Sequence, residues 1–331
     1  MKKNKNSLKK PMFFLFTCVK DGRKYIQKLF NSLMGQTSKN FVHYIYEDGS
    51  EDSIADLVNE YKKQAASLDE PFDVLYENSK KNIGLNMATK HCIEMCNKEY
   101  FIWIDCDNWI DKDFFYNLEQ TAIKHQDAIM IKTTLYTVLD NGYIFTDIDT
   151  FQKRRINNKR NQIKNFFMNC FPFGFSFFAV KKQFLGDNFT ILDEKHFSND
   201  HQVICQILFK QHPIVWSKKA IGYFLSRDDS EGHANLRVTK GTNLNRQWYL
   251  QLLSKTSADS FKKLTNIYSS LDLYKQMICY LENKQYSQAL KTMRHKRKIN
   301  RKCKLEIKYY CKYHNDLYWF LKIVVFSILH R

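Results

Sequence analysis

Short apolar runs alternate with amphipathic segments over the first third of the chain. The apolar runs have the length of strands and occupy residues 13–19, 41–46, 72–76 and 100–104. The segments between them carry apolar side chains at helical spacing, at residues 25–34, 54–61 and 87–95. This alternation predicts βαβ units, and therefore an α/β fold with a mostly parallel sheet flanked by helices.

The pattern changes twice further along the chain. Residues 117–224 are mixed, with strand-length runs at 128–132, 175–180 and 214–216 and a helical stretch at 199–209. Beyond residue 243 the pattern is helical, and neither Pro nor Gly follows Gly241. We therefore predict a basic N-terminal tail at 1–11, an α/β domain at 12–235 and a basic α-helical C-terminal region at 236–331.

Polar residues follow three of the predicted strands. Thr17, Asp48 and Asp105 stand where the first, second and fourth runs end. Ligands of open α/β sheets bind beyond the carboxyl ends of the strands. The three residues are therefore predicted to gather at one ligand-binding edge.

The fourth run ends in the sequence FIWIDCDN, the strongest local signal in the chain. Asp105 and Asp107 are two positions apart, which in an extended strand puts them on one side, roughly 6.5–7 Å apart. One carboxylate could then bind a sugar hydroxyl and the other Mg²⁺ or Mn²⁺, which commonly takes one or two carboxylates together with substrate phosphates. The alternative is a polar strand end whose Asp residues cap the following turn.

Several segments, taken in order, resemble a known family. FFLFTCVKDGRKYIQKLFNSLMGQT, YEDGSED and NIGLNMATKHCIEMCNKEYFIWIDCDN resemble the opening strand and helix, the D-G-S-x-D turn and the approach to the D-x-D motif of family-two glycosyltransferases with the GT-A fold. FSNDHQVICQIL resembles the E-D segment, and IGYFLSRDDSEGH resembles the Y-x-Y-R…H segment. The chain departs from the family pattern at residues 17–20, 89–90 and Asn199, where P-x-Y-N, R-N and Glu are usual.

The resemblance implies a Rossmann-like GT-A catalytic domain at 12–235 and a set of donor-binding residues. Thr17 and Asp48 would hold the nucleotide base, and Asp105 would hold the ribose or the donor sugar. Asp107 would bind the metal, Mn²⁺ or Mg²⁺, that bridges the diphosphate.

Two further roles follow from the resemblance, and simpler explanations compete with them. Asp200 would be the general base, and His233 would be an added metal ligand or a diphosphate contact. Asp200 is also a good helix cap, His233 lies in a polar loop, and Asp48 is suited to a turn. Other groups that could serve as the base are His201, Asp187, Asp193 and Glu194.

Positive charge is concentrated near the end of the chain. The 331 residues carry a formal net charge of +18, and residues 251–331 hold 17 Lys or Arg against five Asp or Glu. This basic segment, densest at 291–308, fits an anionic membrane surface, nucleic acid or a solvated helical face. The apolar stretch at 318–329 is too short for a membrane span and suggests an interfacial anchor, a packed helix or an oligomer contact.

The number and spacing of the cysteines indicate the cellular compartment of the protein. The chain has nine cysteines, an odd number with no C-x-x-C pair, which fits a reducing compartment better than a disulfide framework. No apolar run reaches the roughly 18 residues of a membrane span, and the first residues lack the pattern of a secretory signal. We therefore expect a cytoplasmic protein, peripheral at the inner face of the cell membrane.

These features together predict a metal-dependent, inverting glycosyltransferase. Its donor would be a nucleotide-diphospho-sugar, with UDP-sugars favoured, and its acceptor a hydroxyl of a cell-envelope polysaccharide or of a lipid- or protein-linked glycan. A basic nucleic-acid-binding protein is an alternative, but no helix-turn-helix, zinc-finger or RNP-like stretch supports it. Sugar-1-phosphate nucleotidyl transfer is another, although the loop at 18–23 has one glycine where a triphosphate cradle usually has several.

Overall fold

The computed structural model describes residues 12–139, 142, 144–146, 176–186, 189–191, 199–209 and 212–227. All of them belong to one compact unit, formed by Met1–Phe166 and Cys170–Arg227. The predictions for the N-terminal tail, for the C-terminal region at 236–331 and for His233 concern residues outside the described ranges.

The first half of this unit alternates strands and helices as the sequence predicts. Its elements are β1 (Phe13–Val19), α1 (Arg23–Met34), β2 (Phe41–Asp48), α2 (Ala55–Ala66), β3 (Val74–Ser79), α3 (Leu85–Met95) and β4 (Tyr100–Trp103). Strand β1 pairs in parallel with both β2 and β4, and β2 pairs in parallel with β3. The predicted βαβ units are therefore confirmed.

The second half adds strands of both directions. Its elements are β5 (Trp109–Ile110), α4 (Phe114–Lys124), β6 (Met130–Leu139), β7 (Ile144–Thr146), β8 (Ala179–Lys181), α7 (Asn199–Phe209) and β9 (Ile214–Ser226). The long ladder between β6 and β9 is parallel, whereas β8 runs antiparallel to β4 and β6, and β5 antiparallel to β9.

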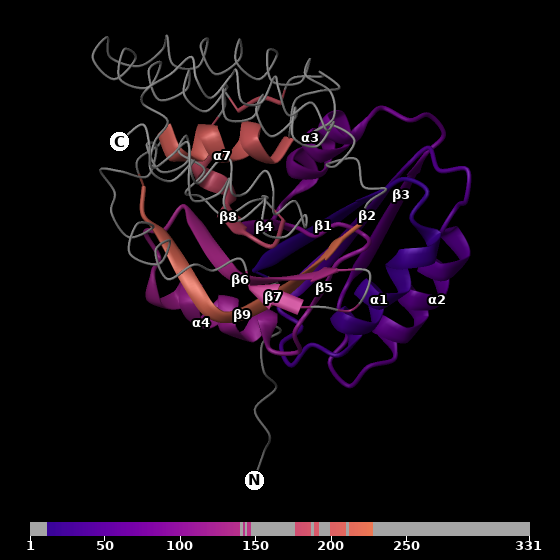
Figure 1. The fold of residues 1–331 in the computed structure, drawn as a ribbon, viewed down its shortest axis with the longest axis horizontal. Coiled ribbons are helices and arrows are strands. Elements are labelled where there is room, and N and C mark those ends of the chain that lie inside the picture. Colours follow the sequence, from indigo (N-terminus) through magenta and orange to yellow (C-terminus); the bar gives the residue numbers. More distant parts are fainter. Residues whose placement is uncertain are drawn as a thin grey trace, which may run out of the picture. The chain divides into compact units, whose positions relative to one another are not determined.

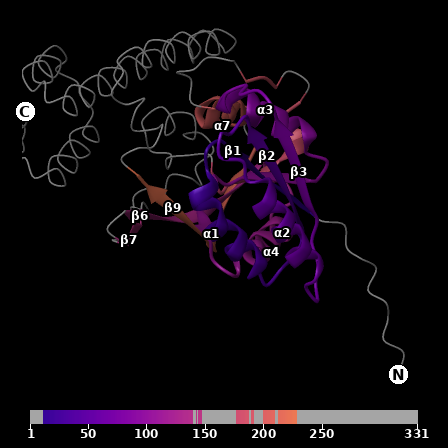
Figure 2. The same cartoon turned by 90° about the vertical axis from the view of Figure 1, so that its right-hand side faces the viewer.

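The described strands form one sheet with helices on both faces (Figure 1). The strand order is β3-β2-β1-β4-β8-β6-β9-β5, with β7 beside β6. Helices α1, α2 and α4 cover one face, and α3 and α7 lie on the other (Figure 2). This arrangement confirms the predicted α/β class with a mixed, mostly parallel sheet.

Both faces of β1 are buried, which explains why its sequence is a continuous apolar run. Phe13, Leu15 and Val19 belong to the core on the side of α1 and α2. Phe14 and Phe16 alternate with them and stack on Tyr44 and Trp103. Among the described residues, no helix combines the length and the apolar character that crossing a bilayer requires.

Candidate functional site

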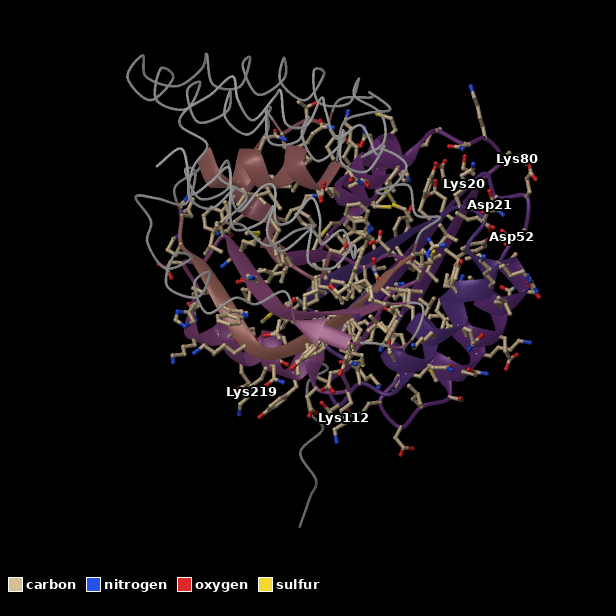
Figure 3. All side chains as sticks on the ribbon, viewed as in Figure 1. Lys20, Asp21, Asp52, Lys80, Lys112 and Lys219 are labelled. Atoms are coloured by element: carbon tan, nitrogen blue, oxygen red, sulfur yellow. The ribbon has the colours of Figure 1, made fainter. Side chains whose placement is uncertain are left out.

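The loops that follow β1 and β2 are joined at the carboxyl end of the sheet. Asp21 Oδ1 accepts a hydrogen bond from the Glu51 N–H at 2.8 Å, and the Asp21 N–H donates to Ser50 Oγ at 3.1 Å. Figure 3 shows Lys20, Asp21, Asp52 and Lys80 at this end of the sheet, with Lys112 and Lys219 at the opposite end. The carboxyl ends of the parallel strands therefore share one edge, as the sequence predicts.

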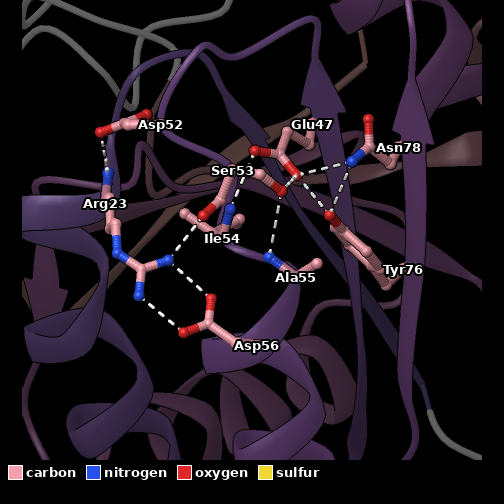
Figure 4. Close-up of polar contacts among 9 residues, drawn as sticks. All are labelled: Arg23, Glu47, Asp52, Ser53, Ile54, Ala55, Asp56, Tyr76 and Asn78. Carbon is pink, nitrogen blue, oxygen red and sulfur yellow. Dashed lines mark hydrogen bonds and ion pairs between the residues drawn. The ribbon is translucent and has the colours of Figure 1, made fainter.

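Glu47, near the end of β2, anchors the start of α2. Its carboxylate is buried and accepts hydrogen bonds from the Ile54 N–H at 3.0 Å, from Asn78 Nδ2 at 3.1 Å and from the Tyr76 hydroxyl (Figure 4). Ile54 directly precedes α2, so Glu47 satisfies a backbone donor that the helix leaves unpaired at its N-terminus. Arg23 ties α1 to the same helix through two 2.6 Å contacts with Asp56 (Figure 4).

Asp48, the last residue of β2, anchors the start of α3 in the same way. Its two carboxylate oxygens accept hydrogen bonds from the Ile83 N–H at 2.7 Å and the Gly84 N–H at 2.9 Å. Gly49 follows at a φ of 64°, and a Cβ there would lie 2.5 Å from the Asn82 nitrogen. Asp48 thus lies at the predicted edge, where it holds the turn before α3.

The side chain of Thr17 lies in the core and not at this edge. It is fully buried, and its Oγ1 lies 3.1 Å from Nε2 of His43, whose Nδ1 lies 3.2 Å from the Tyr61 hydroxyl. Burial lowers the pKa of His43 to about 3, so the imidazole is neutral at physiological pH. The Thr17 hydroxyl therefore lies beside His43 in the core, and not among the carboxylates at the strand ends.

Asp105 follows β4 and is held by two side-chain donors. Its Oδ2 accepts hydrogen bonds from Ser176 Oγ at 2.8 Å and from Asn108 Nδ2 at 3.1 Å. Asn108 is buried, and its Oδ1 accepts a hydrogen bond from the Leu225 N–H of β9 at 3.0 Å. The turn that carries Asp105 is therefore fixed to β9 as well as to the residues before β8.

A strained residue positions Ser176. Phe177 has a φ of 73°, in the left-handed region that non-glycine residues rarely adopt. Its N–H donates to the Trp103 carbonyl at 2.7 Å, and its ring packs so closely on Gly222 that a Cβ there would come within 2.4 Å. These contacts hold the strained backbone beside Ser176, and so direct the hydroxyl toward Asp105.

Asp107 is paired with Arg227, the residue after β9. Arg227 Nε and Nη2 donate to Asp107 Oδ2 at 3.0 and 2.8 Å, and the two side chains are only 13% (Asp107) and 20% (Arg227) exposed. The guanidinium also lies 4.3 Å from the ring centroid of Tyr25 in α1. Sequence reasoning did not single out Arg227, although it is the Arg of the segment that resembles Y-x-Y-R.

The pKa of Asp105 responds to the charged residues around it. Burial, and secondly the charge of Asp107, raise the pKa of Asp105 to about 7. The hydrogen bond from Ser176 opposes this rise, the charge of Asp200 adds to it, and the charge of Arg227 opposes it. Asp105, Asp107, Asp200 and Arg227 therefore form one charged cluster at the carboxyl end of the sheet.

Asp200 lies in the first turn of α7, which occupies the range that the sequence predicts. The preceding Asn199 is buried, and its Nδ2 donates to Thr89 Oγ1 of α3 at 2.8 Å. Thr89 and Asn199 are both departures from the family pattern, and the structure shows that they contact each other. The competing candidates for the base, the His201 side chain, Asp187, Asp193 and Glu194, lie outside what the structure describes.

The described residues include no group of three or more His, Cys, Asp or Glu placed to hold a metal ion. A divalent cation that takes one or two carboxylates together with ligand phosphates needs fewer protein groups. Asp107 could supply such a carboxylate, because its negative charge attracts the Arg227 guanidinium and raises the pKa of the neighbouring Asp105. The site therefore fits a metal that is completed by its ligand.

Comparison with known proteins identifies the family. The model of glycosyl transferase family 2 matches residues 15–184, which is about half of the chain. This chain belongs to glycosyl transferase family 2. The sequence motifs therefore predict the family correctly.

Two relatives named as glycosyltransferases match parts of the chain. EpsH of Bacillus subtilis (strain 168) is 31% identical over 120 residues, which cover 36% of this chain and 33% of EpsH. GlyA of Streptococcus pneumoniae serotype 4 is 25% identical over 107 residues, which cover 32% of this chain and 14% of GlyA. The chain thus spans a third or less of the relatives that it matches.

Two solved structures are similar in fold to this chain. TarS of S. aureus, residues 1–349 with UDP-GlcNAc, matches with a TM-score of 0.59 at 14% identity, and the match covers 94% of this chain and 90% of the TarS chain. The mannosyltransferase PcManGT of Pyrobaculum calidifontis, with GDP-Man and Mn²⁺, matches with a TM-score of 0.54 at 9% identity, and the match covers 96% of this chain and 87% of the PcManGT chain. The predicted GT-A fold is thereby confirmed.

Proposed function

We propose that this glycosyltransferase moves a sugar from a nucleotide-diphospho-sugar to a glycan hydroxyl, with inversion at the anomeric carbon. The observation that carries the proposal is the cluster of Asp105, Asp107 and Asp200 with Arg227 at the carboxyl end of the sheet. The bound UDP-GlcNAc of TarS and the GDP-Man of PcManGT, which share the fold, support this class of donor. UDP-sugars are the first donors to test.

Each member of the cluster has a role suited to its surroundings. Asp105, held by Ser176 and Asn108, would accept hydrogen bonds from the ribose or the donor sugar. Asp107 would hold Mn²⁺ or Mg²⁺. When bound, the cation stabilises the negative charge that grows on the departing diphosphate.

Asp200 would act as the general base. A glycan hydroxyl is a poor nucleophile, so a carboxylate must accept its proton as it attacks the anomeric carbon. The start of α7 places Asp200 close enough to affect the pKa of Asp105, on the element that Asn199 fixes to α3. Attack from one side with a single base gives inversion.

The acceptor and the location follow as further parts of the proposal. A cell-envelope polysaccharide, or a lipid- or protein-linked glycan, would supply the hydroxyl. The basic segment at 291–308 would bind an anionic membrane surface and so bring the enzyme to a lipid-linked acceptor. Membership of family 2 argues against the nucleic-acid-binding and nucleotidyltransferase alternatives.

Donor turnover tests these roles. A thermal-shift screen of nucleotide sugars with Mn²⁺ or Mg²⁺ identifies the donor, and its hydrolysis or transfer is then followed with and without EDTA. We expect EDTA and Asp107→Ala each to abolish turnover, and Asp200→Asn to lower kcat by roughly 10²–10⁴-fold with donor binding retained. The exposed Asp69→Ala is the matched control and should behave as wild type.

Two results would contradict the proposal. If turnover survives both EDTA and Asp107→Ala, Asp107 does not hold a metal that the reaction needs. If Asp200→Asn keeps a normal kcat but loses donor affinity, Asp200 binds the donor and is not the general base.

A further inference from the structure

A cation already contacts the carboxylate that is proposed to bind the metal. Two nitrogens of Arg227, Nε and Nη2, donate to the same oxygen of Asp107, Oδ2. We propose that Arg227 competes with the divalent cation for Asp107, so that metal binding requires the guanidinium to be displaced. This inference rests on the proposed metal role of Asp107 and adds a control over that same site.

The competition follows from the position of the charges. A metal ion on Asp107 Oδ2 and the guanidinium at 2.8–3.0 Å from the same atom would be like charges a few ångströms apart. Water screens them little, because the side chains are only 13% and 20% exposed. Both cations therefore cannot hold this oxygen without a large electrostatic cost.

The structure also offers the displaced guanidinium a second partner. Its centre lies 4.3 Å from the Tyr25 ring centroid, at a distance where a guanidinium is attracted to an aromatic face. Arg227 could thus leave Asp107 and keep its contact with α1. In that state Nε and Nη2, which now donate to Asp107, could instead donate to two oxygens of a phosphate group. Metal and donor would accordingly bind more tightly together than separately.

The binding of Mn²⁺ in the absence of donor isolates the competition. Free Mn²⁺ is measured by electron paramagnetic resonance in titrations of the wild-type full chain, Arg227→Gln and Arg23→Gln. Arg23→Gln is the matched control, because it removes an arginine that is paired with Asp56 and not with Asp107. We expect Arg227→Gln to bind Mn²⁺ about tenfold more tightly than wild type, and Arg23→Gln to stay within about twofold.

A second variant protects the test against loss of folding. Arg227→Lys keeps the charge but not the planar pair of donors, so it should bind Mn²⁺ about threefold more tightly than wild type. Thermal unfolding of each variant shows which are folded. If Arg227→Gln is unfolded, Arg227→Lys alone decides the question.

The outcomes separate this inference from the proposed function. If Asp107→Asn abolishes Mn²⁺ binding but the Arg227 variants bind as wild type does, Asp107 is the metal ligand and the competition does not exist. If none of the proteins binds Mn²⁺, with or without donor, the metal role of Asp107 and the competition both fall. Tighter binding by the Arg227 variants that Asp107→Asn abolishes supports both.

Discussion

Adjacent acidic residues serve different elements at the end of β2. Glu47 accepts the Ile54 N–H before α2, and Asp48 accepts the Ile83 and Gly84 N–H groups before α3. Asp105 differs from both, because the hydrogen bonds to it come from the side chains of Ser176 and Asn108 rather than from a backbone N–H before a helix, and its ionisation is opposed by Asp107 and Asp200. The hydrogen-bond donors therefore distinguish carboxylates that hold the start of a helix, Glu47 and Asp48, from Asp105, which is suited to bind a ligand.

The buried His43 predicts how stability changes in acid. Its pKa is lowered to about 3, so between the unfolded value of about 6.5 and 3 the unfolded chain binds the extra proton. Stability from the neutral imidazole is complete above pH 6.5 and is lost as the pH falls toward 3. At pH 5 the loss is about 2 kcal/mol.

Chemical denaturation of wild type and His43→Gln at pH 5 and pH 7 measures this effect. The unfolding free energy of wild type relative to His43→Gln should fall by that amount at pH 5. An equal difference between the two proteins at both pH values would contradict the assignment of a buried neutral imidazole.

Gly49 and Gly84 provide a second comparison at the residue scale. Both have positive φ, but a Cβ at Gly49 meets the Asn82 nitrogen at 2.5 Å, whereas nothing lies within 4 Å of a Cβ at Gly84. Gly84 has a φ of 86° and a ψ of 151°, a combination that only glycine adopts readily, so we expect Gly84→Ala to lower the unfolding free energy by about 1–3 kcal/mol. Gly49→Ala should lower it by a larger amount, because its Cβ would also clash with the Asn82 backbone. Urea denaturation checks the order, and equal losses would show that the turn after β2 can move away from α3.

At the element scale, the sequence predicts the buried parallel strands and α7 well. The runs at 13–19 and 199–209 coincide with β1 and α7, because an apolar run or a helical stripe defines each of them directly. For β9 the sequence predicts only residues 214–216, but the strand extends to Ser226. Its middle contains Ser217, Lys218 and Lys219, and its register with β6 shifts near Thr134, so the apolar pattern is interrupted where the strand continues.

The contact between α3 and α7 gives a prediction at this scale. Thr89→Val removes the acceptor of buried Asn199 Nδ2, so we expect a loss of about 1–3 kcal/mol in unfolding free energy. Because Asn199 directly precedes Asp200, kcat should fall as well while donor affinity is retained.

A double-mutant cycle with Asn199→Ala tests whether the hydrogen bond itself is responsible. The loss in Thr89→Val/Asn199→Ala should be smaller than the sum of the two single losses. Strict additivity would mean that the two side chains stabilise the helices independently.

At the scale of the whole molecule, the site depends on sheet order. Arg227 and Asp107 are 120 residues apart, and they meet because β9 runs beside β5 and ends at the turn after β4. The D-x-D sequence predicts two carboxylates at a strand end, but no local pattern says which distant cation or hydroxyl faces them. Ser176 and Arg227 therefore emerge only from the assembled sheet, whereas Asp105 and Asp107 could be chosen from the chain.

The same assembly makes the stability of the whole unit depend on Asp105. Because its folded pKa is raised to about 7, the folded state binds one more proton than the unfolded chain between about pH 4 and pH 7. The sign is therefore opposite to that of His43. The contribution of Asp105 is fully present below pH 4 and is lost as the pH rises through 7.

Asp105→Asn should remove this dependence, because an amide does not ionise. The unfolding free energy of wild type minus that of Asp105→Asn should therefore decrease between pH 5 and pH 8. Most of this decrease should occur between pH 5 and pH 7. A series of urea titrations with Asp69→Asn as the exposed control measures it. A difference that stays constant across this range would mean that Asp105 is ionised throughout, and that burial and Asp107 do not act on it as the structure indicates.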